Sequence, residues 1–145
     1  MDAAPSMLRV GLVAHWFNRG QATVARYLRG ALEESGHQTF VLARPTNDRF
    51  PIPRYVSRDD VWAQPGVTAA SSATPPTSEY LKWAAEHELD VVLVDQNYQF
   101  DALSALRRAG VRVLGRFVWE SVREQDVHQA ASAMDVVYSF TRAEH

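Results

Sequence analysis

The chain contains no cysteine and a single lysine, Lys82, and its hydrophobic residues are not gathered into any long run. The absence of cysteine excludes a disulfide framework and a thiolate metal site. No apolar run approaches the ~18 residues of a membrane span, and no charged start precedes a signal-like apolar core. Net charge is also low, at −2, and the 15 basic residues are scattered, which argues against a nucleic-acid or anionic-membrane partner. We therefore expect a cytoplasmic protein without an integral membrane segment.

Regular structure is indicated by short apolar runs, rich in β-branched residues, that alternate with amphipathic segments. Hydrophobic residues make up 46% of the 145 positions, which suits one core, and the length is too small for two domains. Asn18 with Gln21 forms a capping box at the start of the first helix, and Gly36 ends it. Strands are predicted at 7–14, 38–43, 90–95, 111–119 and 135–140, and helices at about 20–36, 77–89, 100–110 and 123–133.

Residues 44–77 interrupt this alternation. The segment holds six of the seven prolines and the tract AASSATPP, and its one plausible strand lies at 54–57. We predict a Pro-rich irregular loop with a possible edge strand. Residues 1–145 then form one α/β domain: a three-layer, Rossmann-like, doubly wound parallel sheet of about six strands, in the order 3-2-1-4-5-6.

Polar and aromatic side chains follow three of the predicted strands. HWFNRG (15–20) follows the first, DQNYQ (95–99) ends the fourth, and WE (119–120) ends the fifth. In the predicted order the winding reverses between the first and fourth strands, and ligands bind outside the carboxyl ends of strands at such a point. Aromatic rings and side-chain amides suit a polyhydroxylated ligand, and the N–H groups of a helix start suit an anion. The candidate binding residues are Trp16, Asn18, Gly20, Gln21, Gln96, Asn97, Tyr98, Trp119 and Glu120.

His15 and Asp95 are the candidate catalytic residues, because paired titratable groups in a cleft are typical of active sites. As a base, His15 would take the proton of an acceptor hydroxyl, and Asp95 would orient the imidazole. The alternatives are structural. His15 would then be a half-buried loop histidine bonded to backbone, and Asp95 a cap of the following helix. Arg116 is a candidate partner of Glu120.

The sequence lacks the motifs of several other classes of protein. Gly11 and Gly20 do not form the G-x-G-x-x-G of nicotinamide sites, and no phosphate-binding G-x-x-x-x-G-K-[ST] loop occurs. No acidic pair ends the first strand, which argues against a phospho-accepting receiver domain. The other histidines fall on helix ends and faces, so no metal site is predicted.

Three stretches of the chain resemble the N-terminal domain of GT-B fold glycosyltransferases of family 4, the group 1 kind. They are GQATVARYLRGALEESGHQTFVLA, LDVVLVDQN and AMDVVYSFTRAEH, and the resemblance covers nearly the whole chain. It implies that this chain is the acceptor-binding domain of an enzyme that transfers a sugar to an acceptor. The acceptor would be another sugar or a different hydroxylated molecule. The donor, a nucleotide-diphosphate sugar, would be held by a C-terminal domain absent from this chain, which would need no cofactor of its own. As a candidate base for the proton of the acceptor hydroxyl, His15 is similar to the catalytic base of some inverting GT-B enzymes.

The last residues indicate a longer protein. Thr141 to Glu144 form a capping box, the signal for a helix that the sequence does not go on to supply. We therefore expect a fragment that folds and is inactive without the donor domain. Two other interpretations stay open: a non-catalytic binding or assembly module, for instance the acceptor subunit of a two-chain glycosyltransferase, and a small nucleotide-binding Rossmann-like enzyme.

Overall fold

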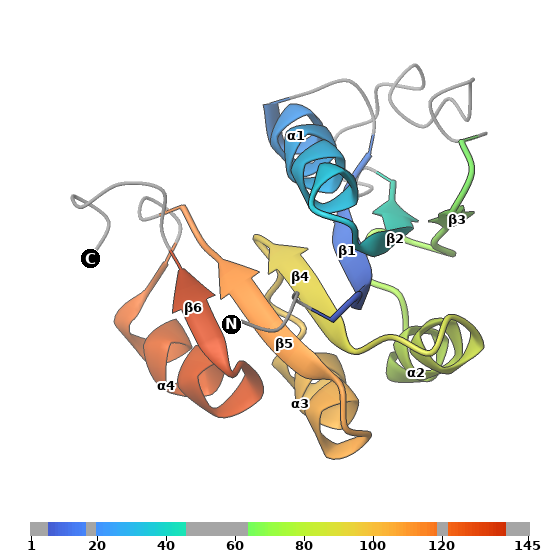
Figure 1. Cartoon of the computed structure of the whole chain (residues 1–145). Coiled ribbons are helices and arrows are strands. Elements are labelled where there is room, and N and C mark those ends of the chain that lie inside the picture. The colour runs from blue at the N-terminus through green and yellow to red at the C-terminus, as the bar shows by residue number, and fades with distance from the viewer. Residues whose placement is uncertain (1–5, 17–19, 46–63, 119–121, 139–145) are drawn as a thin grey trace, which may run out of the picture.

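The computed structural model describes residues 6–16, 20–45, 64–118 and 122–138. Within them lies a six-stranded parallel sheet in the order β3-β2-β1-β4-β5-β6 (Figure 1). The strands are β1 (Arg9–His15), β2 (Gln38–Arg44), β3 (Val67–Ala69), β4 (Val91–Asp95), β5 (Arg112–Arg116) and β6 (Val136–Tyr138). The helices are α1 (Gly20–Glu34), α2 (Thr77–Glu86), α3 (Phe100–Arg108) and α4 (Glu124–Ala133). The predicted α/β class and strand order are confirmed.

The third strand is the main departure from the sequence prediction. It is formed by Val67–Ala69 and pairs with β2 inside the segment that we expected to be irregular, whereas residues 54–57 lie outside the described residues. A strand of three residues at the edge of a sheet is too short to show the alternation of apolar and polar side chains by which strands are recognised. Here Thr68 and Ala69 are both exposed. Gly66, at a φ of 76°, turns the chain into this strand, and its carbonyl accepts a hydrogen bond from Val41 N at 2.8 Å.

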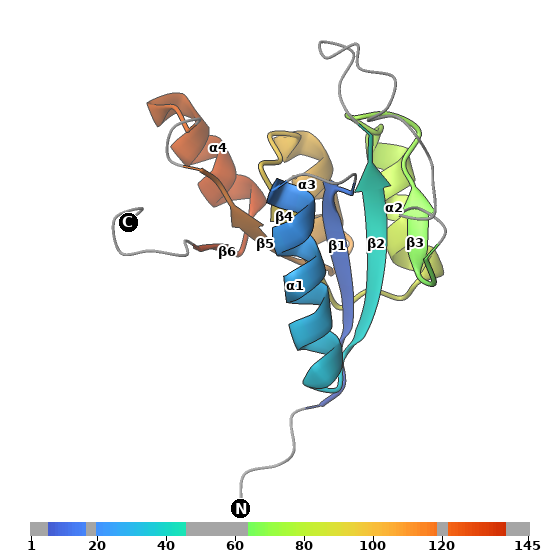
Figure 2. The same cartoon turned by 90° about the horizontal axis from the view of Figure 1, so that it is seen from above.

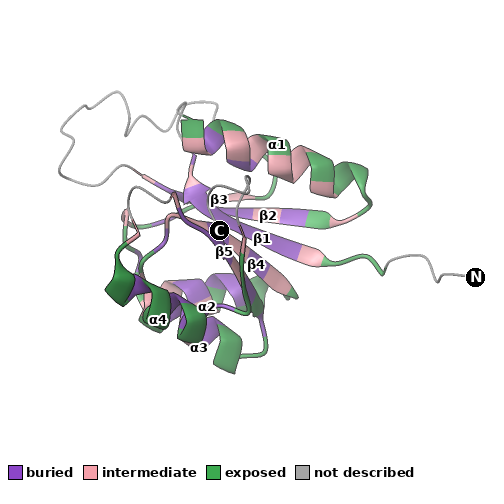
Figure 3. Cartoon of the chain, turned by 90° about the vertical axis from the view of Figure 1, so that its left-hand side faces the viewer, coloured by how far each residue is buried: buried purple, intermediate pink, exposed green. Residues whose placement is uncertain are grey.

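The two faces of the sheet are covered unequally. Figure 3 shows α1 on one face and α2, α3 and α4 together on the other. The direction of winding explains this, because the chain moves one way from β1 to β2 and the opposite way from β3 through β6 (Figure 2). Right-handed crossovers then place the connecting helices on opposite faces. The described chain therefore has two cores, a small one under α1 and a large one under the other three helices.

The α1 side of the sheet is covered only over β1 and β2. Further along the same face, Leu93 of β4 and Leu114 of β5 are neighbours in the sheet and only partly buried, and Val136 of β6 is 49% exposed. No helix among the described residues lies over these three strands (Figure 3). An all-parallel sheet normally has both faces covered, so this half-face is a surface on which more protein can pack.

Gly11 marks the closest approach between the sheet and a helix. A Cβ at this position would lie 2.6 Å from Cη2 of Trp83 and 2.7 Å from Cδ1 of Leu89. Both neighbours are buried, and the indole of Trp83 cannot yield without shifting α2. The absence of a side chain at Gly11 is therefore what allows α2 to pack against the centre of the sheet.

We predict that Gly11→Ala lowers the free energy of unfolding by about 1–3 kcal/mol, because the added methyl overpacks the core. Gly30→Ala on α1 is the matched control. A Cβ there meets nothing within 4 Å, so the same chemical change should stabilise the helix by roughly 0.5–1 kcal/mol. Urea denaturation of the two variants checks both signs, and equal stability of Gly11→Ala and the unsubstituted chain would contradict the packing argument.

Candidate functional site

The carboxyl ends of β1 and β4 lie side by side at the centre of the sheet. From β1 the chain turns into α1 on one face, and from β4 into α3 on the other (Figure 1). This is the reversal of winding at which open α/β sheets bind ligands. The predicted site residues on β1 and β4 are therefore brought to one edge, as expected.

His15 ends β1 and is held by the backbone of the neighbouring strand. Its Nδ1 lies 3.0 Å from the carbonyl oxygen of Pro45. Because a carbonyl only accepts, Nδ1 carries the proton and donates it, and Nε2 is the basic nitrogen of the neutral ring. Burial lowers the pKa of His15, the positive charge of Arg44 lowers it further, and the negative charge of Asp95 acts in the opposite direction. The imidazole is therefore neutral at pH 7, the form that a general base requires.

Asp95 is bonded to Arg116 and not to the imidazole. Its Oδ2 accepts a hydrogen bond from Arg116 Nη2 at 2.9 Å, and the two side chains are only 13% and 9% exposed. The strand register gives the reason. Val13 pairs with Val94, so Asp95 projects to the same face as Ala14, while His15 belongs to the opposite face. We had expected Asp95 to orient the imidazole, and that part is taken by the carbonyl of Pro45. The predicted pairing of Arg116 with Glu120 involves a residue that lies outside the described residues.

Asn97 holds the loop after β4 in place through hydrogen bonds. It is completely buried, its Nδ2 donates to Tyr80 Oη at 2.9 Å, and its Oδ1 accepts from the backbone N–H of Gln99 at 2.9 Å. Tyr80 Oη in turn donates to Gln99 Oε1 at 2.8 Å, and Gln99 Nε2 donates to the carbonyl of Pro75. This network ties the loop to α2, so the amide of Asn97 supports the site from beneath. Its expected contact with a ligand would need this network to open.

Trp16 is also buried completely, and the guanidinium of Arg26 lies over its ring at 4.5 Å from the centroid. Arg26 further donates to the carbonyl oxygen of Trp16. One face of the indole is thus occupied by a side chain of α1. A sugar stacked on Trp16, as the sequence suggested, would have to reach a ring with no exposed surface.

The remaining candidates lie at the rim. Tyr98 is 37% exposed, with its ring tilted against Phe117 at 5.1 Å. Gln96 is partly buried and has a φ of 50°, a left-handed conformation uncommon outside glycine and enriched at functional sites. Gly20 and Gln21 begin α1, exposed and partly exposed respectively. The candidates outside the described residues are Asn18, Trp119 and Glu120.

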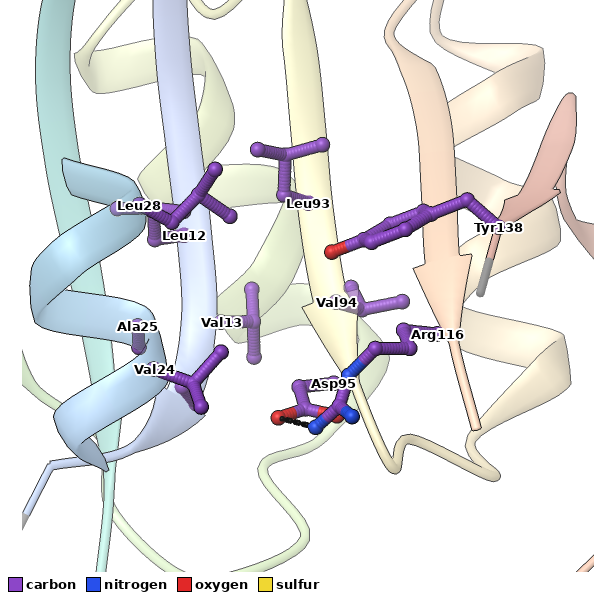
Figure 4. A pocket seen from close by; sticks show the side chains of 11 residues that line it. Leu12, Val13, Val24, Ala25, Leu28, Leu93, Val94, Asp95, Arg116 and Tyr138 are labelled. Carbon is purple, nitrogen blue, oxygen red and sulfur yellow. Dashed lines mark hydrogen bonds and ion pairs between the residues drawn. The ribbon is translucent and has the colours of Figure 1, made fainter. Parts of the chain in front are cut away.

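A small pocket lies between α1 and the ends of β4 and β5 (Figure 4). Aliphatic side chains form most of its wall, and the ion pair of Asp95 and Arg116 lies at one end. The ring of Tyr138 extends from β6 across β5 toward β4 (Figure 4). Sequence reasoning missed Arg44 and Tyr80 as members of this edge. Arg44 stands at the end of an apolar strand and could have been noticed, whereas Tyr80 gives no signal within its helix.

Within the described ranges, no group of three or more histidine, cysteine, aspartate or glutamate side chains could hold a metal ion. The described helices are also each too short or too polar to cross a bilayer.

No protein-family model and no curated protein matches the chain. Among solved structures it is similar to the signal receiver domain of NarL from Mycobacterium tuberculosis, at 17% identity and a TM-score of 0.51, over 97% of this chain and 90% of that one. It is also similar to an alpha-glucosyltransferase in complex with UDP and a 13-mer DNA containing an HMU base. That match has 14% identity and a TM-score of 0.55, and covers 91% of this chain but only 37% of the glucosyltransferase chain. At these identities the likeness is one of fold.

We predict that protonation of His15 destabilises the fold. Its pKa is lowered by burial, so below about pH 6.5 the unfolded chain binds the proton first. The free energy of unfolding should therefore fall as the pH drops from 6.5, with no contribution from His15 above that pH. His15→Gln should make this pH dependence shallower. NMR titration of the imidazole measures the group directly, and a pKa above 6.5 would overturn the prediction.

Proposed function

We propose that this chain is the acceptor-binding half of a nucleotide-sugar-dependent glycosyltransferase that transfers a sugar to a hydroxylated acceptor. The observation that carries the proposal is His15, a neutral imidazole with its proton on Nδ1, at the edge of the sheet where ligands bind. The fold shared with part of an alpha-glucosyltransferase supports it. That chain is longer than this one, which leaves room there for a second domain.

The proposed chemistry is general base catalysis. An acceptor hydroxyl is a poor nucleophile at neutral pH, and a positioned base contributes roughly 10² to 10⁴-fold in rate. His15 would take the hydroxyl proton on Nε2 while the carbonyl of Pro45 holds Nδ1 in place. The ring would become a cation, which the nearby negative charge of Asp95 favours. Asp95 would thus assist through its charge, without a hydrogen bond to the ring.

The acceptor would lie across the rim. Tyr98 offers an exposed aromatic face, and Gln96 offers an amide beside it, with Tyr98 Oη donating to Gln96 Oε1 at 3.3 Å. Gly20 and Gln21 would present the N–H groups at the start of α1. Asn18, Trp119 and Glu120 remain predicted contacts. Trp16 and Asn97 would act from beneath, by holding α1 and the loop after β4 in place.

The donor, a nucleotide-diphosphate sugar, would be bound by a second domain, in the same chain or another. On the α1 face, the described helices leave β4, β5 and β6 uncovered, which supports the proposal that another segment or domain packs there. Right-handed crossovers put α2, α3 and α4 on the other face, so these three helices cannot cover β4, β5 and β6 on the α1 side. We propose the segment after β6, because the capping box of Thr141 and Glu144 predicts a helix there. These two residues lie outside the described residues.

A non-catalytic binding module is the second candidate. It is favoured by the similarity to a signal receiver domain, because that match covers 90% of a domain of comparable length. In that case the edge at His15 would bind a ligand or partner without turning it over. Sugar transfer by the protein together with its donor domain decides between the two candidates.

We predict that the 145-residue chain alone folds and neither transfers sugar nor hydrolyses donors. The groups that bind the diphosphate would belong to the second domain. Circular dichroism with a cooperative melt tests folding, and incubation with UDP-, GDP- and ADP-sugars, followed by chromatography of released nucleotide, tests activity. Turnover by this chain alone would refute the division into two halves.

We predict that His15→Ala, in the protein joined to its donor domain, lowers kcat by at least about tenfold. His128→Ala is the control, since it removes an exposed histidine of α4 that belongs to neither the catalytic nor the binding residues of the proposal. Steady-state kinetics separate the roles. A rise in KM alone would make His15 a binding residue, and unchanged activity with a lower Tm would make it structural.

A further inference from the structure

Arg44 is a buried cation that forms no ion pair with any of the described residues. It is the last residue of β2, lies beside His15 in the strand register, and is only 6% exposed. Its Nε donates to the carbonyl oxygen of Ala73 at 2.6 Å. Its Nη1 is shielded from solvent and has no hydrogen-bond partner, and no carboxylate forms an ion pair with Arg44 in the part of the chain that the structure describes.

The neighbouring carboxylates are already used. Asp95, whose charge reaches Arg44, is bonded to Arg116. Glu79, in the first turn of α2, accepts hydrogen bonds from the backbone N–H and the hydroxyl of Ser71. Among the described residues, neither carboxylate forms an ion pair with Arg44, so its buried positive charge is not compensated there. A buried charge without a partner is strongly unfavourable, and Asp95 Oδ1 is also buried without a hydrogen bond.

We propose that Arg44 is the anchor of an oxyanion site, which binds a phosphate or carboxylate group at the end of β2. The planar guanidinium presents donors in a fork that matches such groups. The site lies at the ligand-binding edge of the sheet, next to the proposed base. Because Nη1 is covered, binding includes a rotation of the guanidinium toward the ligand. An acceptor that carries an acidic group is the corresponding substrate class. This last statement rests on the proposed function, whereas anion binding itself does not.

The site also couples the ligand to His15. The positive charge of Arg44 lowers the pKa of the imidazole, and an anion bound to Arg44 would offset that charge. Among the described residues, the charges that act on His15 are those of Arg44 on β2 and Asp95 on β4. Arrival of an acidic acceptor would therefore raise the proton affinity of His15 and make it a stronger base when the substrate is in place.

Inorganic phosphate and acetate are the probes, in thermal melts of the chain at constant ionic strength. We expect phosphate, acetate or both to raise the Tm of the unsubstituted protein by about 3 °C or more at saturation, and the difference between them identifies the preferred oxyanion. Arg44→Met should abolish the shift, and without anion its Tm should be no lower, since it removes an uncompensated charge. Arg107→Met is the matched control, because Arg107 pairs with Asp135 at the other end of the strands and its loss should leave the shift intact.

NMR titration of His15 is the second measurement, and it needs no variant. We expect the pKa of the imidazole to rise when the effective anion is added to the unsubstituted protein. Equal melts with and without both anions would overturn the proposal. A shift that survives in Arg44→Met would overturn it too, as would a His15 titration that does not respond to either anion. None of these results depends on sugar transfer, so the site can fail while the proposed function stands.

Discussion

The parallel pairing of β1 with β4 is the interaction on which the rest of the structure depends. The two strands are separated by about half of the chain. Asp90 joins them at their start, because its carboxylate accepts a hydrogen bond from Arg9 N at 2.8 Å and its own N–H donates to Arg9 O at 2.9 Å. The pairing places β2 and β3 on one side and β5 and β6 on the other. It creates the reversal of winding, and with it the edge where His15, Arg44, Asp95 and Arg116 meet.

The same pairing decides which charges face each other. With Val13 opposite Val94, Asp95 lies on the α1 face and finds Arg116, while His15 and Arg44 lie on the α2 face. Asp95 is thereby paired with Arg116, and Arg44 lies next to a neutral histidine and forms no ion pair with the described residues. A shift of β4 by one residue would exchange these faces and remove the arrangement. Beneath it, the bonds from Asn97 to Tyr80 keep the loop after β4 in place.

The similarity to both a receiver domain and a glucosyltransferase is a statement about architecture. Without the short edge strand β3, the order β2-β1-β4-β5-β6 is the 2-1-3-4-5 order of other doubly wound sheets. Such folds serve many chemistries, so function has to be inferred from the side chains at the carboxyl edge. Here these are an imidazole with a defined tautomer and a buried guanidinium.

By itself, the sequence determined the fold class, the strand order and the edge that carries the polar residues. These follow from local patterns, apolar runs and helix signals, together with the handedness of crossovers. It could not locate β3, because three mostly exposed residues carry no pattern. Only the tertiary structure decided that Pro45 and not Asp95 holds His15, that Trp16 and Asn97 are buried, and that Arg44 has no counterion among the described residues. The physical reason is that such contacts depend on strand register and on packing between segments far apart in the chain, which no local pattern encodes.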